Sequence, residues 1–147
     1  MIDRLEDRME IAELRARYCQ YYDHGRVDDF MTLFAPDALL ELGPMGIPHG
    51  TDEIRAAVVE AQKVSSGPGQ FIRHFNPPGT TDFVDDDHAV GASHLLFQLG
   101  GEPDLTGAGT YYDEYVKLDG DWRFAARHLT FLYFGEQPGG WPSIPGA

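Results

Sequence analysis

The stretch GTYYDEYVKLDGDWRFAARHLTFLYF, residues 109–134, decides the fold class. Aromatic and β-branched residues fill both of its halves. Asp119-Gly120 separates them, which is typical of two antiparallel strands joined by a two-residue turn. Earlier segments of similar composition extend the pattern to a long antiparallel meander. The sequence therefore predicts strands over 71–75, 89–99, 109–118 and 122–134.

The N-terminal part of the chain follows a helical period instead. We expect helices over 3–23, 27–34 and from Thr51 or Asp52 to 63, with a short strand over 38–42. The first helix carries two apolar stripes at spacings of three and four residues, so we expect it to be covered on two sides. One stripe comprises Leu5, Met9, Ala12, Ala16 and Cys19, and the other comprises Ile11, Leu14, Tyr18 and Tyr22.

Helices followed by an antiparallel meander indicate the α+β class. We expect one domain over 1–147, a cone-shaped barrel in which a curved, antiparallel or mixed sheet wraps around the N-terminal helices. Such a sheet can curve this strongly only if side chains or a ligand fill its inner face. The fold prediction therefore includes an internal pocket.

Composition excludes several classes of protein. The chain has 11 Lys and Arg against 24 Asp and Glu, a net charge of -13. This charge repels nucleic acids and anionic lipid surfaces, so we expect neither as a partner. The single cysteine, Cys19, excludes an internal disulfide and multi-cysteine metal sites. No apolar run could span a bilayer and the start MIDRLEDRME is too charged for a signal peptide, so we expect a cytoplasmic protein.

Two residues stand out as candidates for acid–base chemistry. Asp23 continues the stripe through Cys19 while carrying a carboxylate, and a charge on a buried face needs a partner. In FIRHFN, strand alternation places Ile72 and His74 on one face, which favours an inward His74. A carboxylate beside a buried histidine raises its basicity and fixes its tautomer. We predict an Asp23–His74 dyad; the alternatives are an Asp23 that reaches water and a His74 that only packs.

Other side chains could complete a binding site. His94 and His128 are candidates for a second histidine in the pocket. Each could equally be a packed core residue. Phenols such as Tyr18, Tyr22 and Tyr133 could orient a carbonyl or a hydroxyl, although most tyrosines are core residues. The sequence has no HExxH, no Gly-rich phosphate loop and no GxSxG motif. We therefore expect chemistry without a metal or a cofactor.

The order of these motifs resembles a known family. IAELRARYCQYYDHGRVDDFMTLFAPDALLEL, HGTDEI, FIRHFN and GTYYDEYVKLDGDWRFAAR together are similar to the SnoaL-like branch of the nuclear-transport-factor-two-like superfamily, over roughly residues 5–135. Members include scytalone dehydratase, bile-acid 7α-dehydratase and hexachlorocyclohexane dehydrochlorinase. The resemblance implies a cone-shaped α+β barrel and a cofactor-free Asp–His pair that removes a proton during elimination.

The resemblance also suggests roles for individual residues. It implies that Asp23 and His74 are the catalytic pair and that Tyr18 is a pocket tyrosine. His94 lies within one residue of a second catalytic histidine of scytalone dehydratase. Arg127 is the nearest match to an arginine that the bile-acid enzyme carries in its last strand. With the phenols above, the predicted substrate-binding residues are Tyr18, Tyr22, His94, Arg127 and Tyr133.

The function predicted from these residues is a lyase, a dehydratase of an apolar, ring-containing molecule such as a polyketide or steroid-like compound. One alternative is an isomerase or polyketide cyclase that uses the same base, and another is a non-catalytic binding or assembly subunit.

Two further features are expected. A homo-oligomer, trimer or dimer, would cover an outer sheet face bearing Phe97, Leu99 and Val116. The Gly/Pro-rich tail over 135–147 contains Trp141 and Ile144 and could close the pocket as a lid.

Overall fold

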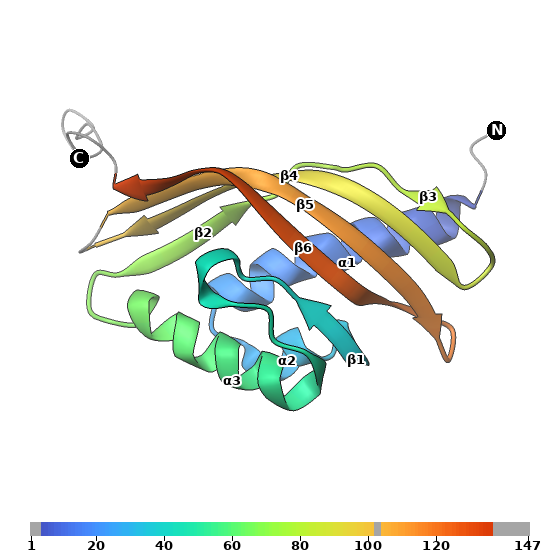
Figure 1. Cartoon of the computed structure of the whole chain (residues 1–147), viewed down its shortest axis with the longest axis horizontal. Coiled ribbons are helices and arrows are strands. Elements are labelled where there is room, and N and C mark those ends of the chain that lie inside the picture. The colour runs from blue at the N-terminus through green and yellow to red at the C-terminus, as the bar shows by residue number, and fades with distance from the viewer. Residues whose placement is uncertain (1–3, 102–103, 137–147) are drawn as a thin grey trace.

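Three helices lie along one face of a curved sheet (Figure 1). The computed structural model describes residues 4–101 and 104–136. The helices within these ranges are α1 (Leu5–Asp23), α2 (Val27–Met31) and α3 (Gly50–Gln62), with single 3₁₀ turns at η1 (Gly43–Met45) and η2 (Lys63–Ser65). The strands are β1 (Phe34–Leu40), β2 (Phe71–Phe75), β3 (Asp82–Phe83), β4 (His88–Gly100), β5 (Leu105–Leu118) and β6 (Asp121–Glu136).

The sheet is mixed and open. Over the described residues its six strands follow the order β1-β6-β5-β4-β2, and β3 pairs with β4. β1 runs parallel to β6, whereas the other pairs are antiparallel. The two ends of this order do not pair, so the sheet curves around the helices without closing. The predicted α+β cone is confirmed.

The turn between β5 and β6 is the hairpin that the sequence predicts. Asp119 has φ 52° and Gly120 has φ 89°, so both residues adopt the left-handed conformation of a tight hairpin turn. Leu118 pairs with Asp121 directly across it. This hairpin fixes the register of the two longest strands.

Two bulges interrupt β6. Ala125 is extra between the pairs Glu114–Ala126 and Tyr115–Phe124, and Leu132 is extra opposite Ala108 and Gly109. Each extra residue reverses which side chains of the strand face inward. The inward side chains of β6 therefore change from even-numbered to odd-numbered positions at Ala125 and back to even-numbered positions at Leu132.

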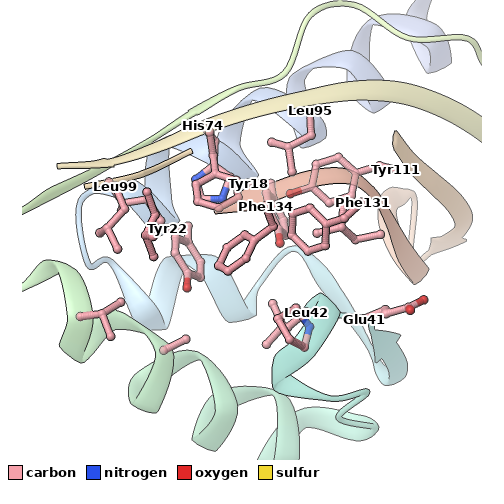
Figure 2. A pocket seen from close by; sticks show the side chains of 17 residues that line it. Tyr18, Tyr22, Glu41, Leu42, His74, Leu95, Leu99, Tyr111, Phe131 and Phe134 are labelled. Carbon is pink, nitrogen blue, oxygen red and sulfur yellow. The ribbon is translucent and has the colours of Figure 1, made fainter. Parts of the chain in front are cut away.

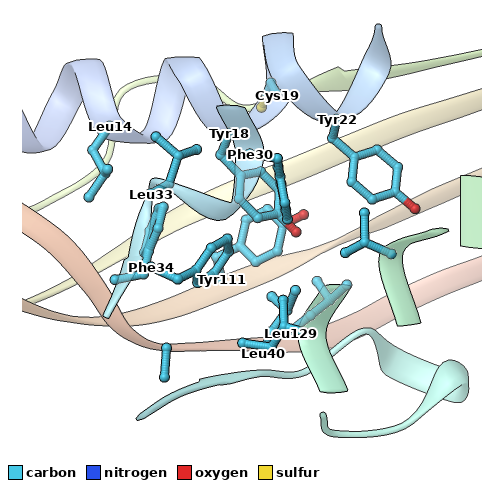
Figure 3. Close-up of a cluster of buried hydrophobic side chains, with 14 of the residues drawn as sticks. Leu14, Tyr18, Cys19, Tyr22, Phe30, Leu33, Phe34, Leu40, Tyr111 and Leu129 are labelled. Atoms are coloured by element: carbon cyan, nitrogen blue, oxygen red, sulfur yellow. The ribbon is translucent and has the colours of Figure 1, made fainter. Parts of the chain in front are cut away.

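The core lies between α1 and the inner face of the sheet. Figure 3 shows Tyr18, Phe30, Phe34 and Tyr111 meeting there from α1, α2, β1 and β5. The helix buries its second apolar stripe. The first stripe was expected to be buried as well, and this is wrong: Leu5 is 55% and Met9 64% exposed, because the sheet covers α1 along one side only.

The segment after α1 also differs from expectation. The second helix ends at Met31, and β1 begins at Phe34 instead of residue 38. Pro36 lies within β1. An edge strand tolerates proline because one of its sides needs no hydrogen-bond donors. β1 pairs with β6 on one side, and on the other side an isolated bridge joins Leu39 to His49, beyond Pro36.

The outer face of the sheet carries different apolar residues from those expected. Phe97 and Leu99 are buried on the inner face. On the outer face, Leu96, Tyr112 and Leu132 are 51%, 53% and 82% exposed. Self-association stays a prediction, now through these side chains.

Gly135 and Glu136 belong to β6, which shortens the predicted tail, and the rest of the proposed lid lies outside the described residues. Among the described helices, none has the length and apolar character needed to cross a membrane.

Candidate active site

A cavity of about 220 Å³ opens between the inner face of the sheet and the ends of the helices (Figure 2). Its walls are almost entirely apolar, and the polar groups are three phenols, one imidazole and one carboxylate. The residues that line it are Tyr18, Tyr22, Glu41, Leu42, Pro44, Ala61, Val64, Ile72, His74, Leu95, Phe97, Leu99, Leu105, Tyr111, Leu129, Phe131 and Phe134.

Asp23 and His74 meet at the wall of this cavity. Asp23 is the last residue of α1, and one of its carboxylate oxygens accepts a hydrogen bond of 2.8 Å from the His74 backbone N–H. The other oxygen lies 2.5 Å from Nδ1 of the His74 ring. The two side chains are 5% and 10% exposed. The contact expected from the sequence is therefore present, with His74 lining the cavity and Asp23 behind it.

Local structure explains why these two residues meet. α1 stops after Asp23 because Gly25 adopts a left-handed conformation, with φ 67°. β2 then passes the end of the helix with Ile72 and His74 directed inward, as alternation predicts. The stripe argument for Asp23 does not hold, since most of that stripe is exposed. The carboxylate is buried because β2 covers it.

Aromatic rings fix the orientation of the His74 imidazole. The Tyr22 ring lies 5.2 Å from it at an interplanar angle of 77°, and the Tyr18 ring lies 6.4 Å away at 88°. On the other side is Phe97, the cross-strand partner of His74, at 5.9 Å. Because Nδ1 faces Asp23, the second ring nitrogen, Nε2, faces the cavity, and it has no hydrogen-bond partner among the described residues.

The cavity phenols are neutral hydrogen-bonding groups. Burial raises the pKa of Tyr18 to about 12 and raises the pKa of Tyr22 and of Tyr111 further. They therefore keep their protons near neutral pH and can donate hydrogen bonds to an oxygen atom in the cavity.

Arg127 has a different place from the one expected. The prediction that it contacts the substrate is not met, because the fully buried Arg127 does not line the cavity. It forms a two-fold ion pair with Asp113, with N–O distances of 2.8 and 3.0 Å. The bulge at Ala125 turns Arg127 inward, and the rings of Tyr18 and Tyr111 lie between it and the cavity.

His94 and Tyr133 do not face the cavity either. His94 shares the outward face of β4 with Leu96 and is exposed, because strand alternation places both opposite to Leu95. Tyr133 is 47% exposed, since the bulge at Leu132 turns its neighbour Phe134 inward instead. His128 lies on the outer face as well, 3.3 Å from the Glu41 carboxylate.

The aromatic wall of the cavity was not predicted from the sequence. Phe97, Phe131 and Phe134 pack against one another with ring centroids 5.4 to 6.1 Å apart. Gly107 makes room for Phe97, since a Cβ at this position would lie 2.2 Å from its ring. Phe97 follows from strand alternation, whereas Phe131 and Phe134 both face inward only because of the bulge at Leu132.

No group of three or more His, Cys, Asp or Glu side chains suited to a metal ion occurs over residues 4–101 and 104–136.

Comparison with known proteins agrees with the fold. Residues 3–128 match the SnoaL-like domain family, and no curated protein matches the sequence. Among solved structures, LinA has a TM-score of 0.84 at 22% identity over 97% of each chain. The dehydrochlorinase LinA-type3 of Novosphingobium barchaimii LL02 has a TM-score of 0.83 at 22% identity, over 97% of this chain and 98% of its own. A proposed scytalone dehydratase of Novosphingobium aromaticivorans DSM 12444 has a TM-score of 0.80 at 23% identity, over 97% of this chain and 95% of its own.

Proposed function

The chain belongs to the SnoaL-like domain family, and we propose that it is a cofactor-independent lyase, a dehydratase of an apolar, ring-containing small molecule. The observation that carries this proposal is the contact between Asp23 and His74 at the wall of an apolar cavity. The dehydratase and dehydrochlorinase names of two similar structures support an elimination reaction.

His74 is the base in the proposed reaction. Its Nε2 takes a proton from a carbon next to a carbonyl group, and Asp23 holds the Nδ1–H tautomer and stabilises the imidazolium that forms. The electron pair of the broken C–H bond moves onto the carbonyl oxygen, where a cavity phenol donates a hydrogen bond. When the enolate collapses, the C–O bond to the leaving hydroxyl breaks. The hydroxyl takes the proton from His74 and departs as water, which returns the base to its neutral form.

The cavity favours an uncharged substrate. No Lys or Arg side chain is among the described residues that line it, and its charged neighbours are the carboxylates of Asp23 and Glu41. An anionic group would therefore lose its hydration without gaining a cation. Apolar walls also exclude water from the proton transfer, which strengthens the interactions inside the site.

Turnover of a simple β-hydroxy ketone tests the proposal. The probe is the aromatic β-hydroxy ketone that yields benzylideneacetone on loss of water, and the conjugated product is followed by ultraviolet absorbance and mass spectrometry. We expect conversion by the native protein and a loss of about 10²–10⁴-fold in His74→Ala. The matched control is His94→Ala, a β4 histidine on the outer face, which should keep the native rate.

A second measurement separates the alternative functions. In deuterium oxide, the native protein should exchange the protons next to the carbonyl of α-tetralone, and His74→Ala should not. Exchange without loss of water from any hydroxy ketone would indicate an isomerase or cyclase. Equal exchange rates in the native protein and in His74→Ala would contradict the role of this histidine altogether.

Self-association is part of the proposal. Leu96, Tyr112 and Leu132 leave apolar area on the outer face of the sheet that a second copy would cover. Sedimentation should give a mass above that of one chain, and Leu132→Glu should lower it. A native protein that sediments as a single chain at micromolar concentration would contradict this.

A further inference from the structure

A buried ion pair lies beneath the cavity. Arg127 and Asp113 have side chains that are 0% exposed, and the Tyr115 hydroxyl donates a further hydrogen bond of 2.8 Å to Asp113. Asp113 keeps Arg127 charged: burial opposes the charge, but the carboxylate outweighs it and raises the pKa of the guanidinium above its usual value. A fixed positive charge is therefore present inside the core.

This charge lies directly against two cavity tyrosines. The Cζ atom of Arg127 is 3.8 Å from the ring centroid of Tyr111 and 4.2 Å from that of Tyr18. Both side chains also line the cavity. Nη1 of Arg127 is buried and has no hydrogen-bond partner among the described residues. The guanidinium thus contacts two side chains of the cavity wall without lining the cavity itself.

Stability does not account for this arrangement. A buried ion pair is often no more stable than apolar side chains of the same volume, and a buried donor without a partner is a cost. Phe124 already packs against the same guanidinium, with its ring centroid 4.6 Å from Cζ, so an apolar residue would fit these surroundings. The retained charge points to a role in the chemistry of the cavity.

The two phenols lie next to one another at the cavity wall. Their ring centroids are 5.9 Å apart, and Figure 3 shows the two side chains side by side. Because burial raises the pKa of both, each keeps its proton and can donate a hydrogen bond. A cation on the ring faces draws on the electrons of the phenols, which strengthens the hydroxyls as donors.

We propose that Arg127 is a positioning residue whose charge, held by Asp113, polarises the Tyr18 and Tyr111 rings so that a cavity phenol donates a strong hydrogen bond to a carbonyl oxygen in the cavity. This inference rests on the proposed function for the identity of that oxygen, an atom on which negative charge develops. In agreement, the charge of Arg127 lowers the pKa of Tyr18, against the larger effect of burial.

Two probes of similar size test the proposal without any turnover. Acetophenone carries a carbonyl oxygen, and cumene carries a methyl group in its place. The native protein should prefer acetophenone once the transfer free energies from water are subtracted, and the carbonyl stretching frequency of the bound ketone should fall. In the double variant Arg127→Met with Asp113→Leu, we expect that preference to drop about tenfold, the scale of one hydrogen bond. The cumene affinity should stay within about twofold.

Further variants keep the test decisive. Arg127→Gln with Asp113→Asn removes both charges but keeps hydrogen-bonding groups. It should also lose the preference for the ketone, and it replaces the Arg127→Met, Asp113→Leu variant if that variant does not fold. Arg127→Lys keeps the charge and should retain most of the frequency shift. Tyr112→Phe removes a phenol hydroxyl from the outer face of β5 and should change neither quantity. Neutral pairs with the native preference and frequency would overturn the proposal, as would a native protein that does not prefer the ketone.

The test of Arg127 can succeed or fail independently of the test of the proposed function. His74→Ala should abolish proton exchange and leave the ketone preference unchanged. A chain that catalyses no elimination but shows a preference that depends on Arg127 would still support this inference.

Discussion

The two ends of α1 differ in how completely the protein satisfies the hydrogen bonds of their polar groups. At the N-terminal end, Asp7 accepts hydrogen bonds of 2.8 Å from Trp122 Nε1, 2.9 Å from Lys117 Nζ and 2.8 Å from Arg4 Nε. The Arg4 guanidinium also donates to two loop carbonyls and covers the ring of Phe83 at 4.0 Å. Each oxygen of the Asp7 carboxylate has a protein partner.

The C-terminal end of the same helix leaves one polar group open. Asp23 is fully engaged by His74, but His74 turns Nε2 toward an apolar cavity that the protein does not fill. A protein interior usually satisfies its polar groups and fills its voids. The difference indicates that the Asp7 end anchors the helix to the sheet, whereas the Asp23 end gives up some packing for chemistry.

The largest expected effect separates the two ends by activity. In Asp23→Asn the amide cannot accept both hydrogen bonds of His74, so the ring loses the tautomer and the anion that support proton transfer. We expect turnover of the β-hydroxy ketone and exchange of α-tetralone to fall about a thousandfold. Asp7→Asn is the matched control and should keep most of the native rate per folded molecule. Similar losses of rate in both variants would contradict the division.

Asp7→Asn should lose more stability than Asp23→Asn, the reverse of their order by loss of activity. Asp7→Asn removes the anion that Trp122 and Lys117 share and leaves a partly buried indole N–H with a weaker acceptor. We expect the free energy of unfolding to fall by about 1–3 kcal/mol. Urea unfolding of the two asparagine variants measures this difference. A larger loss in Asp23→Asn than in Asp7→Asn would reverse our assignment of the anchoring end.

The pH dependence of stability should distinguish the Asp7 end further. Hydrogen bonds from Trp122 and Lys117 lower the pKa of Asp7. A lowered pKa stabilises the folded state above the ordinary value of about 4, and this contribution is lost as the pH falls below it. The stability gap between the native protein and Asp7→Asn should thus be widest above about pH 5 and close in acid. A gap that stays constant down to the acid transition would exclude the carboxylate as its source.

Local signals in the sequence were sufficient for part of the fold and of the site. The period change from helix to strand, the Asp119-Gly120 turn and the inward face of His74 are local signals, and each predicted its element correctly. Burial on α1 was predicted less well, because two stripes compete and only the packing of the sheet decides between them. The stripe that contains Leu5 and Met9 is the exposed one.

The wall of the cavity lay beyond local signals for a different reason. Bulges at Ala125 and Leu132 depend on how β6 pairs with β5, and no residue type in β6 identifies them. Each bulge reverses the faces of the strand, which is why Arg127 lies under the tyrosines and Phe134 replaces Tyr133. Alternation was sufficient for β2, which has no bulge.

The smallest effect that we predict refines the comparison at the cavity itself. Gly107 lies in β5, and a Cβ there would come within 2.2 Å of the Phe97 ring, which lines the cavity beside His74. In Gly107→Ala the strand is held by pairing on both sides, so the ring has to turn into the cavity. Overpacking of this kind should weaken acetophenone binding about fivefold while the anchoring end is unaffected.

Adding Phe97→Leu should restore the affinity, because the smaller side chain returns the lost space. Gly135→Ala in β6, where a Cβ meets its nearest neighbour at 3.4 Å, is the control and should bind normally. If Gly107→Ala binds the ketone as tightly as the native protein does, then Phe97 does not limit the cavity.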